Sequence, residues 1–260
     1  VASIYAVGML KGRRDRLHRL GLIIPLTIAC IATPLQLLVG DTAAREVAHH
    51  QPAKFAAMEC IQDTGGHQTE YLGGICTSSG VKVAIPIPDL DSLLVGFSPD
   101  TKVTGLNSIP DDERPPDNTF LHLAFDAMVG IGTALLLLAL WLAYLVYKKR
   151  EIPTNGWFLK AVSISGVGAI LALWSGWIVT EVGRQPWIVY HYMKTSEAVT
   201  DANGIWGAFI FTLLLYATIG TIAVLVLRRM SRRWRESGEG AGEDASGPYS
   251  PLGPETEVRA

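Results

Sequence analysis

The sequence predicts an all-α membrane protein, a polytopic transmembrane helix bundle of three complete spans plus the end of a fourth, with a long extracytoplasmic loop. Hydrophobic residues make up 49% of the chain, and the mean hydropathy is +0.27. The apolar residues are gathered in blocks of about 20 or more, which is the length that an α-helix needs to cross a bilayer. Charged residues are concentrated between these blocks, as is typical of loops at a membrane surface.

The blocks expected to be transmembrane helices are residues 20–40, 120–147, 157–182 and 204–227. Residues 1–10 are also apolar, but they reach only about half the length of a span. We expect this segment to be the end of a truncated transmembrane helix, so that the chain is a C-terminal fragment.

The long segment at residues 41–118 is polar and rich in Gly, Pro and Asp, so it is expected to be a loop. Basic clusters at residues 11–19, 148–160 and 228–235 fall on one side when the spans are threaded through a membrane. The positive-inside rule makes that side cytoplasmic. The long loop and the short loop at residues 184–203 are therefore expected outside.

Several function classes find no support in the sequence. The chain has no CxxC, no C-x-x-C-H, no Gly-rich phosphate loop and no HExxH, and its basic clusters lack the interleaved aromatics of nucleic-acid sites. Cys60 and Cys76 lie in the outer loop, close enough in sequence to form a disulfide, whereas Cys30 is expected to pack inside a span. Residues 236–260 are rich in Gly, Pro, Glu and Ser and are expected to be a disordered cytoplasmic tail.

The most informative stretch is residues 175–187, where charged and aromatic side chains interrupt the end of an apolar block. Trp177, Glu181 and Arg184 have a spacing that places them on one helix face. An ionisable residue in a membrane helix points to function, although a Glu181–Arg184 pair that only joins neighbouring helices fits the same pattern. A polar face beside a strip of small residues suits a bulky planar ligand; the strip is Gly176, Thr180 and Gly183.

Met128 precedes two glycines in the block at residues 120–147. Methionine in a helix usually packs as an apolar residue, yet its thioether is also a soft axial ligand for haem iron. Asp126 is a second acid near the outer boundary, which either faces solvent or contacts a cofactor.

Residues 51–59 contain another candidate site at the start of the outer loop. Pro52 favours a short amphipathic helix after it, which carries Lys54 and Glu59. The alternative is an interfacial helix whose lysine reaches lipid phosphates. The histidines of loops and helix ends are expected to face solvent, and none lies deep enough to be an obvious haem ligand: His49, His50, His67, His122 and His191.

Three separated motifs together resemble subunit I of the cytochrome bd quinol oxidases. They are Gln-Pro-x-Lys-x-Ala-Ala-x-Glu at residues 51–59, Met-Val-Gly at residues 128–130, and Gly-Trp-x-x-x-Glu-x-Gly-Arg-Gln-Pro-Trp at residues 176–187. The resemblance covers residues 1–229 and includes the predicted topology. It implies a quinol:oxygen oxidoreductase as part of the full complex, and a fragment that is inactive alone because the family's histidine ligands precede residue 1.

The resemblance implies a role for each matching residue. Met128 corresponds to an iron ligand of the low-spin haem b, and Glu181 corresponds to a ligand of the high-spin haem b. Lys54 and Glu59 correspond to residues that take part in quinol oxidation, within the quinol-binding loop at residues 41–118. The further residues expected to bind cofactors are Trp177, Arg184 and Gln51.

The same resemblance implies low-spin haem b, high-spin haem b, haem d, and menaquinol or ubiquinol as substrate. It implies subunit II, quinol, oxygen and the lipid bilayer as partners, without nucleic acid, in the plasma membrane of a bacterium. The short quinol loop, the two loop cysteines and the acidic tail resemble actinobacterial members. Many members carry an arginine where this chain has Asp126, so a haem-propionate contact expected there would need another residue.

Two other interpretations account for part of the pattern. A haem-free membrane transporter or channel would use Glu181, Arg184 and Asp126 to line an ion path, but it leaves Met128 and residues 51–59 unexplained. A haem-free structural relative of the oxidase is the other alternative. Haem content separates both from the main interpretation.

Overall fold

The structure is a computed structural model in which the described residues are 1–77, 80–150, 155–200 and 202–240. The chain divides into two units, Val1–Val199 and Thr200–Ala260, and each is described by itself. Four helices are long and apolar enough to cross a membrane: α2 (Arg16–His50), α5 (Asn118–Lys149), α6 (Gly156–Arg184) and α7 (Ile205–Gly240). The all-α class is confirmed. The four candidate spans match the four predicted apolar blocks, so the count of three complete spans in the predicted fold class was one too low.

α2 is longer than the apolar block from which it was predicted. The helix continues from residue 41 to His50, although this segment was assigned to the outer loop. Arg45 forms an ion pair of 2.5 Å with Asp41 one turn earlier, and such i,i+4 pairs support a helix beyond its apolar part. The first part of the predicted outer segment is therefore helical, and the helix ends at His50.

The second unit contains α7, which includes the predicted span at residues 204–227. No residue of its most apolar 18-residue window is buried by other residues of this unit. An apolar surface of this size requires cover by lipid or by another protein. The helix continues through residues 236–240, which were predicted to be disordered, and the rest of that predicted tail lies outside the described residues.

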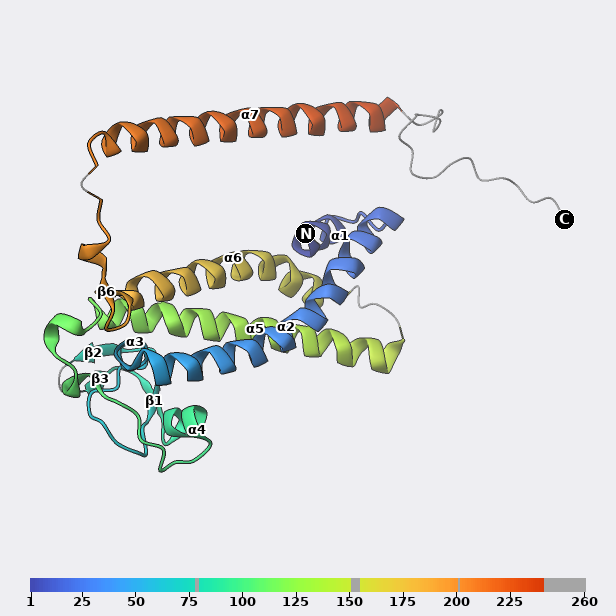
Figure 1. Ribbon diagram of the computed structural model, residues 1–260. Coiled ribbons are helices and arrows are strands. Elements are labelled where there is room, and N and C mark those ends of the chain that lie inside the picture. Colours follow the sequence, from blue (N-terminus) through green and yellow to red (C-terminus); the bar gives the residue numbers. More distant parts are fainter. Residues whose placement is uncertain (78–79, 151–154, 201, 241–260) are drawn as a thin grey trace. The chain divides into compact units, whose positions relative to one another are not determined.

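The segment between α2 and α5 folds over one end of these two helices and α6 (Figure 1). It begins with α3 (Pro52–Met58) and later forms α4 (Leu90–Gly96). A disulfide joins Cys60 to Cys76, the two loop cysteines noted in the sequence. The strands form antiparallel pairs, β1 with β4, β2 with β3 and β5 with β6: β1 (Glu70–Leu72), β2 (Ile75–Thr77), β3 (Gly80–Lys82), β4 (Ile85–Ile87), β5 (Trp187–Val189) and β6 (Met193–Lys194). Short 3-10 turns are at Leu106–Ser108, Asp111–Glu113 and Thr195–Glu197.

The first unit has two separate apolar cores. The loop-end core joins the outer loop to the start of α5 and the end of α6: Phe55, Ala56, Ala57, Met58, Ile61, Val95, Val103, Leu106, Leu121, Ala124 and Val179. The α1-end core joins α1 (Ala2–Leu10), α2, the end of α5 and the start of α6: Ala6, Met9, Leu22, Leu26, Leu142, Phe158, Leu159 and Val162. The loop-end core holds the motif at residues 51–59 against the helices that carry the other two motifs.

Candidate functional site

The end of α6 presents its charged and aromatic residues on the face that the described chain leaves open. Trp177 is 66% exposed, and Glu181 and Arg184 are also exposed, whereas Val179 and Gly183 between them are buried. The three side chains therefore share one face, as their spacing predicts. This open face is available to a group outside the described chain.

The neighbouring strip of small residues on α6 receives side chains from the other two motifs. A Cβ atom at Gly176 would lie 2.9 Å from the Met128 sulfur, so only a glycine leaves room for that sulfur. A Cβ atom at Gly183 would lie 3.0 Å from Lys54 Cγ, so the lysine stem passes directly over this glycine. The strip that was predicted to suit a planar ligand instead packs against Met128 and Lys54, and it brings all three motifs together.

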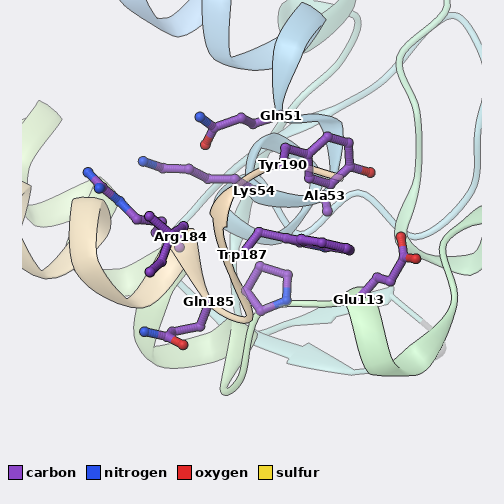
Figure 2. Close-up of a pocket in the computed structure, with 11 residues that line it drawn as sticks. Gln51, Ala53, Lys54, Glu113, Arg184, Gln185, Trp187 and Tyr190 are labelled. Carbon is purple, nitrogen blue, oxygen red and sulfur yellow. The ribbon is translucent and has the colours of Figure 1, made fainter. Parts of the chain in front are cut away.

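A small pocket opens where α3 meets the end of α6 (Figure 2). Its polar lining includes Gln51, Lys54 and Arg184, three of the predicted site residues. The side-chain ends of Lys54 and Arg184 point to the same side in Figure 2. Trp187 also lines the pocket, and its indole Nε1 is buried without a hydrogen-bond partner in the part of the chain that the structure describes. A buried N–H donor without a partner destabilises the folded protein, so a ligand oxygen that accepts a hydrogen bond from it would bind favourably.

The electrostatics of the pocket depend on the contact between α3 and α6. Burial lowers the pKa of Lys54, the guanidinium of Arg184 lowers it further, and the carboxylate of Glu181 opposes both. The lysine of the loop motif is therefore coupled by charge to both ionisable residues of the α6 motif.

Glu59 is not part of this pocket. It is 4% exposed and lies with Glu70 and Asp91 in a buried group of carboxyls. Burial, followed by the neighbouring charges of Glu70 and Asp91, raises the pKa of Glu59 well above its usual range. The sequence analysis missed Glu70 and Asp91, because these acids stand in a loop without periodic pattern and only its folding brings them to Glu59.

The predicted exposure of His122 was wrong, while His49, His50, His67 and His191 are exposed as expected. His122 is 0% exposed, and its Nδ1 lies 2.7 Å from the Met58 carbonyl oxygen. Its Nε2 lies 3.3 Å from the Gly73 carbonyl oxygen. The side chain is buried because the outer loop covers the first turns of α5, which hydropathy alone does not reveal.

Asp126 has a structural role in the same region. Its carboxylate accepts a hydrogen bond of 2.5 Å from the Gly73 backbone N–H and lies 3.5 Å from His122 Nε2. Together, His122 and Asp126 attach the outer loop to α5 within the two turns before Met128. Asp126 was predicted to face solvent or to contact a cofactor. In the structure it contacts the outer loop and His122 instead.

The donor atoms fit the haem groups that the motifs suggest. Met128 is half-buried, and its thioether is a soft donor that suits haem iron. Nothing in the described chain lies within 4 Å of a Cβ built at Gly130 or Gly132, so α5 has open space beside it in the turn after Met128. Glu181 adds a carboxylate on the open face of α6.

Comparison with known proteins gives the family. The pattern of the family described as cytochrome bd terminal oxidase subunit I matches residues 1–234. A Bacillus subtilis protein, provisionally named cytochrome bd menaquinol oxidase subunit I, is 38% identical over 87% of this chain and 52% of its own length. Subunit 1 of the cytochrome bd-II ubiquinol oxidase of Escherichia coli is 23% identical over 93% of this chain and 59% of its own.

A solved structure agrees with this assignment. A chain of the bd oxidase from Geobacillus thermodenitrificans matches with a TM-score of 0.73 and 36% sequence identity, over 89% of this chain and 54% of the solved one. The chain thus spans about half the length of the relatives it matches. Because the family pattern covers almost all of the described residues, the chain belongs to the cytochrome bd terminal oxidase subunit I family.

Proposed function

We propose that the chain acts within a terminal respiratory oxidase of the cytochrome bd type, a quinol:oxygen oxidoreductase of a bacterial plasma membrane. Bound haem b in low-spin and high-spin forms and haem d would supply the one-electron chemistry between quinol and oxygen. The named relatives include a menaquinol and a ubiquinol oxidase subunit, so the proposed substrate is menaquinol or ubiquinol.

The observation that carries this proposal is the convergence of three motifs on one strip of α6. Met128 packs on Gly176 and Lys54 packs on Gly183, while Glu181 lies between these positions in the same helix. Lys54, which is suited to contact quinol, and Met128 and Glu181, which are suited to bind iron, thus all lie at one short segment of α6. Electron transfer between a substrate and a cofactor requires this kind of proximity.

The haem-binding roles fall to α5 and α6. Met128 would be an axial ligand of the low-spin haem b, and Glu181 a ligand of the high-spin haem b. Trp177, beside Glu181 on the open face, would stack against a haem, and Arg184 would pair with a haem propionate.

The quinol-binding roles fall to the pocket between α3 and α6. The pocket is small, so it suits a polar oxygen of the quinol head rather than the whole ring. The Lys54 ammonium, the Gln51 amide and the Trp187 indole N–H are its candidate donors to that oxygen. Glu59 would accept a proton released by quinol. An acceptor must first be ionised, which requires compensation for the charge of the buried carboxyls around it.

The proposed arrangement in the membrane follows from charge. The loop at residues 41–118 would lie outside and the tail in the cytoplasm, because the basic clusters share the opposite side. Subunit II and lipid would cover the exposed apolar faces of the helices. Protons for water would come from the cytoplasmic side.

A reduced-minus-oxidised visible spectrum of the complete complex tests the two proposed ligands. We expect Met128→Ala to remove the low-spin b band and Glu181→Ala to remove the high-spin b signal. Met230→Ala and Glu46→Ala, which replace the same residue types at exposed positions, are matched controls that should keep both.

Two results would count against the proposal. A folded wild-type complex without haem bands would refute the oxidase assignment and lead to ion-flux assays for a transporter. Haem bands that neither Met128→Ala nor Glu181→Ala alters would keep the oxidase and reject both ligands.

A further inference from the structure

Three acidic side chains from different elements meet inside the outer loop. Glu59 directly follows α3, Glu70 begins β1, and Asp91 lies in the first turn of α4. One carboxyl oxygen of each lies within 4.8 Å of those of the other two. The residues are only 4%, 6% and 1% exposed, respectively, so water does not surround this carboxyl cluster.

The carboxyl cluster has no positive partner among the residues that the structure describes. Glu59 Oε2 and both carboxyl oxygens of Asp91 are buried without a hydrogen-bond partner outside the cluster among the described residues. The further charge that acts on Glu59 from α5 is the acid Asp126, which adds negative charge. The nearby His122 faces Asp126 and two backbone carbonyls instead of the cluster. Buried carboxylates without a counter-charge are strongly disfavoured, so a positive species is missing here.

We propose that a hard divalent cation of the calcium type binds between Glu59, Glu70 and Asp91. The cluster offers only oxygen donors, which favours Ca²⁺ over metals that prefer nitrogen or sulfur. Ca²⁺ binds oxygens at about 2.3–2.6 Å, so two ligands on opposite sides of the ion are roughly 4.6–5.2 Å apart. Mg²⁺, with bonds of about 2.0–2.1 Å, requires a tighter cage.

A cation at this position joins α3, β1 and α4. Apolar packing already links α3 to α4, and the disulfide between Cys60 and Cys76 links the end of α3 to β2. The cation therefore fixes the end of α3, the helix that carries Lys54. The binding itself does not depend on the oxidase assignment.

The test uses the complete complex and measures bound calcium by elemental analysis after equilibrium dialysis against buffers of known free Ca²⁺ concentration. We then remove the metal with a chelator and follow the thermal unfolding midpoint as CaCl₂ or MgCl₂ is added back. We expect calcium to bind and to raise the midpoint, with an apparent Kd in the range of roughly 10⁻³ M or tighter, and magnesium to do so less effectively.

Variants assign the calcium to this cluster. Asp91→Asn and, independently, Glu70→Gln should weaken calcium binding by about tenfold or more, because affinity follows the charge of the ligands. Asp111→Asn, an exposed acid of the same loop, is the matched control and should bind calcium like the wild type.

The proposal would be overturned if the wild-type complex bound no calcium and its thermal unfolding midpoint changed with neither chelator nor CaCl₂. Protons would then neutralise the cluster. Calcium binding that survives both Asp91→Asn and Glu70→Gln unchanged would also overturn it. Because the readouts are metal content and thermal stability, a failure of the haem assignment leaves this result interpretable.

Discussion

The two ends of the unit formed by Val1–Val199 differ in what they bury. The α1-end core is built from apolar side chains, such as Phe158, which meets Trp141 edge-on at a ring distance of 5.5 Å. All buried polar side chains of the described residues lie in the outer loop or in the first turns of α5 beneath it: Glu59, Glu70, Asp91, Ser92 and His122. Buried polar groups reduce stability unless they are partnered. The α1 end therefore stabilises the helix bundle, whereas the loop end retains buried polar groups that could take part in chemistry.

The largest expected effect comes from breaking the apolar end. Phe158 is 0% exposed, so Phe158→Ala should lower the free energy of unfolding by about 3–5 kcal/mol, through lost burial and a cavity. Chemical unfolding of the complete complex measures the change, with Phe120→Ala at a 48% exposed position as control. The haem spectrum of the folded fraction should not change. A loss of haem bands at unchanged stability would contradict the division between the two ends.

An intermediate effect is expected from titration of the carboxyl cluster. Burial raises the pKa of Asp91 to about 10, with a contribution from Glu70. The folded chelator-treated protein then holds a proton that the unfolded chain loses near pH 4, so stability should fall as pH rises between these values. The slope is up to about 1.4 kcal/mol per pH unit for one such group.

Asp91→Asn sharpens this comparison because it removes the titrating group. In the presence of chelator, its thermal unfolding midpoint should depend less on pH than that of the wild type between pH 5 and 9. Phe158→Ala, at the apolar end, should keep the wild-type dependence. A wild-type midpoint that rises with pH throughout this range would show that Asp91 is ionised in the folded protein without a cation.

A smaller effect on stability, but a selective one on the site, is expected at Gly176. A Cβ atom there would lie 2.9 Å from the Met128 sulfur, so Gly176→Ala must displace this side chain. Overpacking of this kind costs about 1–3 kcal/mol. The low-spin b band should shift or weaken in the reduced-minus-oxidised spectrum. Gly220→Ala, where a Cβ meets nothing within 4 Å, is the control, and an unaltered band in Gly176→Ala would argue against Met128 as a ligand.

Much of the architecture could be predicted from local pattern. The predicted spans all coincide with long helices, because 20 or more apolar residues have few alternatives in a membrane. The shared face of Trp177, Glu181 and Arg184 also followed from spacing. Helix ends were predicted less well, since polar residues such as Asp41 and Arg45 continue α2 beyond its apolar block.

The composition of the site was less predictable. Nothing in the sequence around His122 indicates burial, and nothing around Glu70 or Asp91 indicates that they join Glu59. These contacts form because the outer loop folds back over the start of α5, where Gly73 reaches His122 and Asp126.

Hydropathy and spacing were thus sufficient for the membrane helices and for the motifs that identify the family, because both depend on neighbours along the chain. Tertiary structure alone decided that Met128 and Lys54 pack on two glycines of α6, and that Glu59 lies apart from Lys54 despite sharing a motif with it. The physical reason is that α3 packs its apolar face on the loop-end core, so the polar residues on its flanks enter different surroundings.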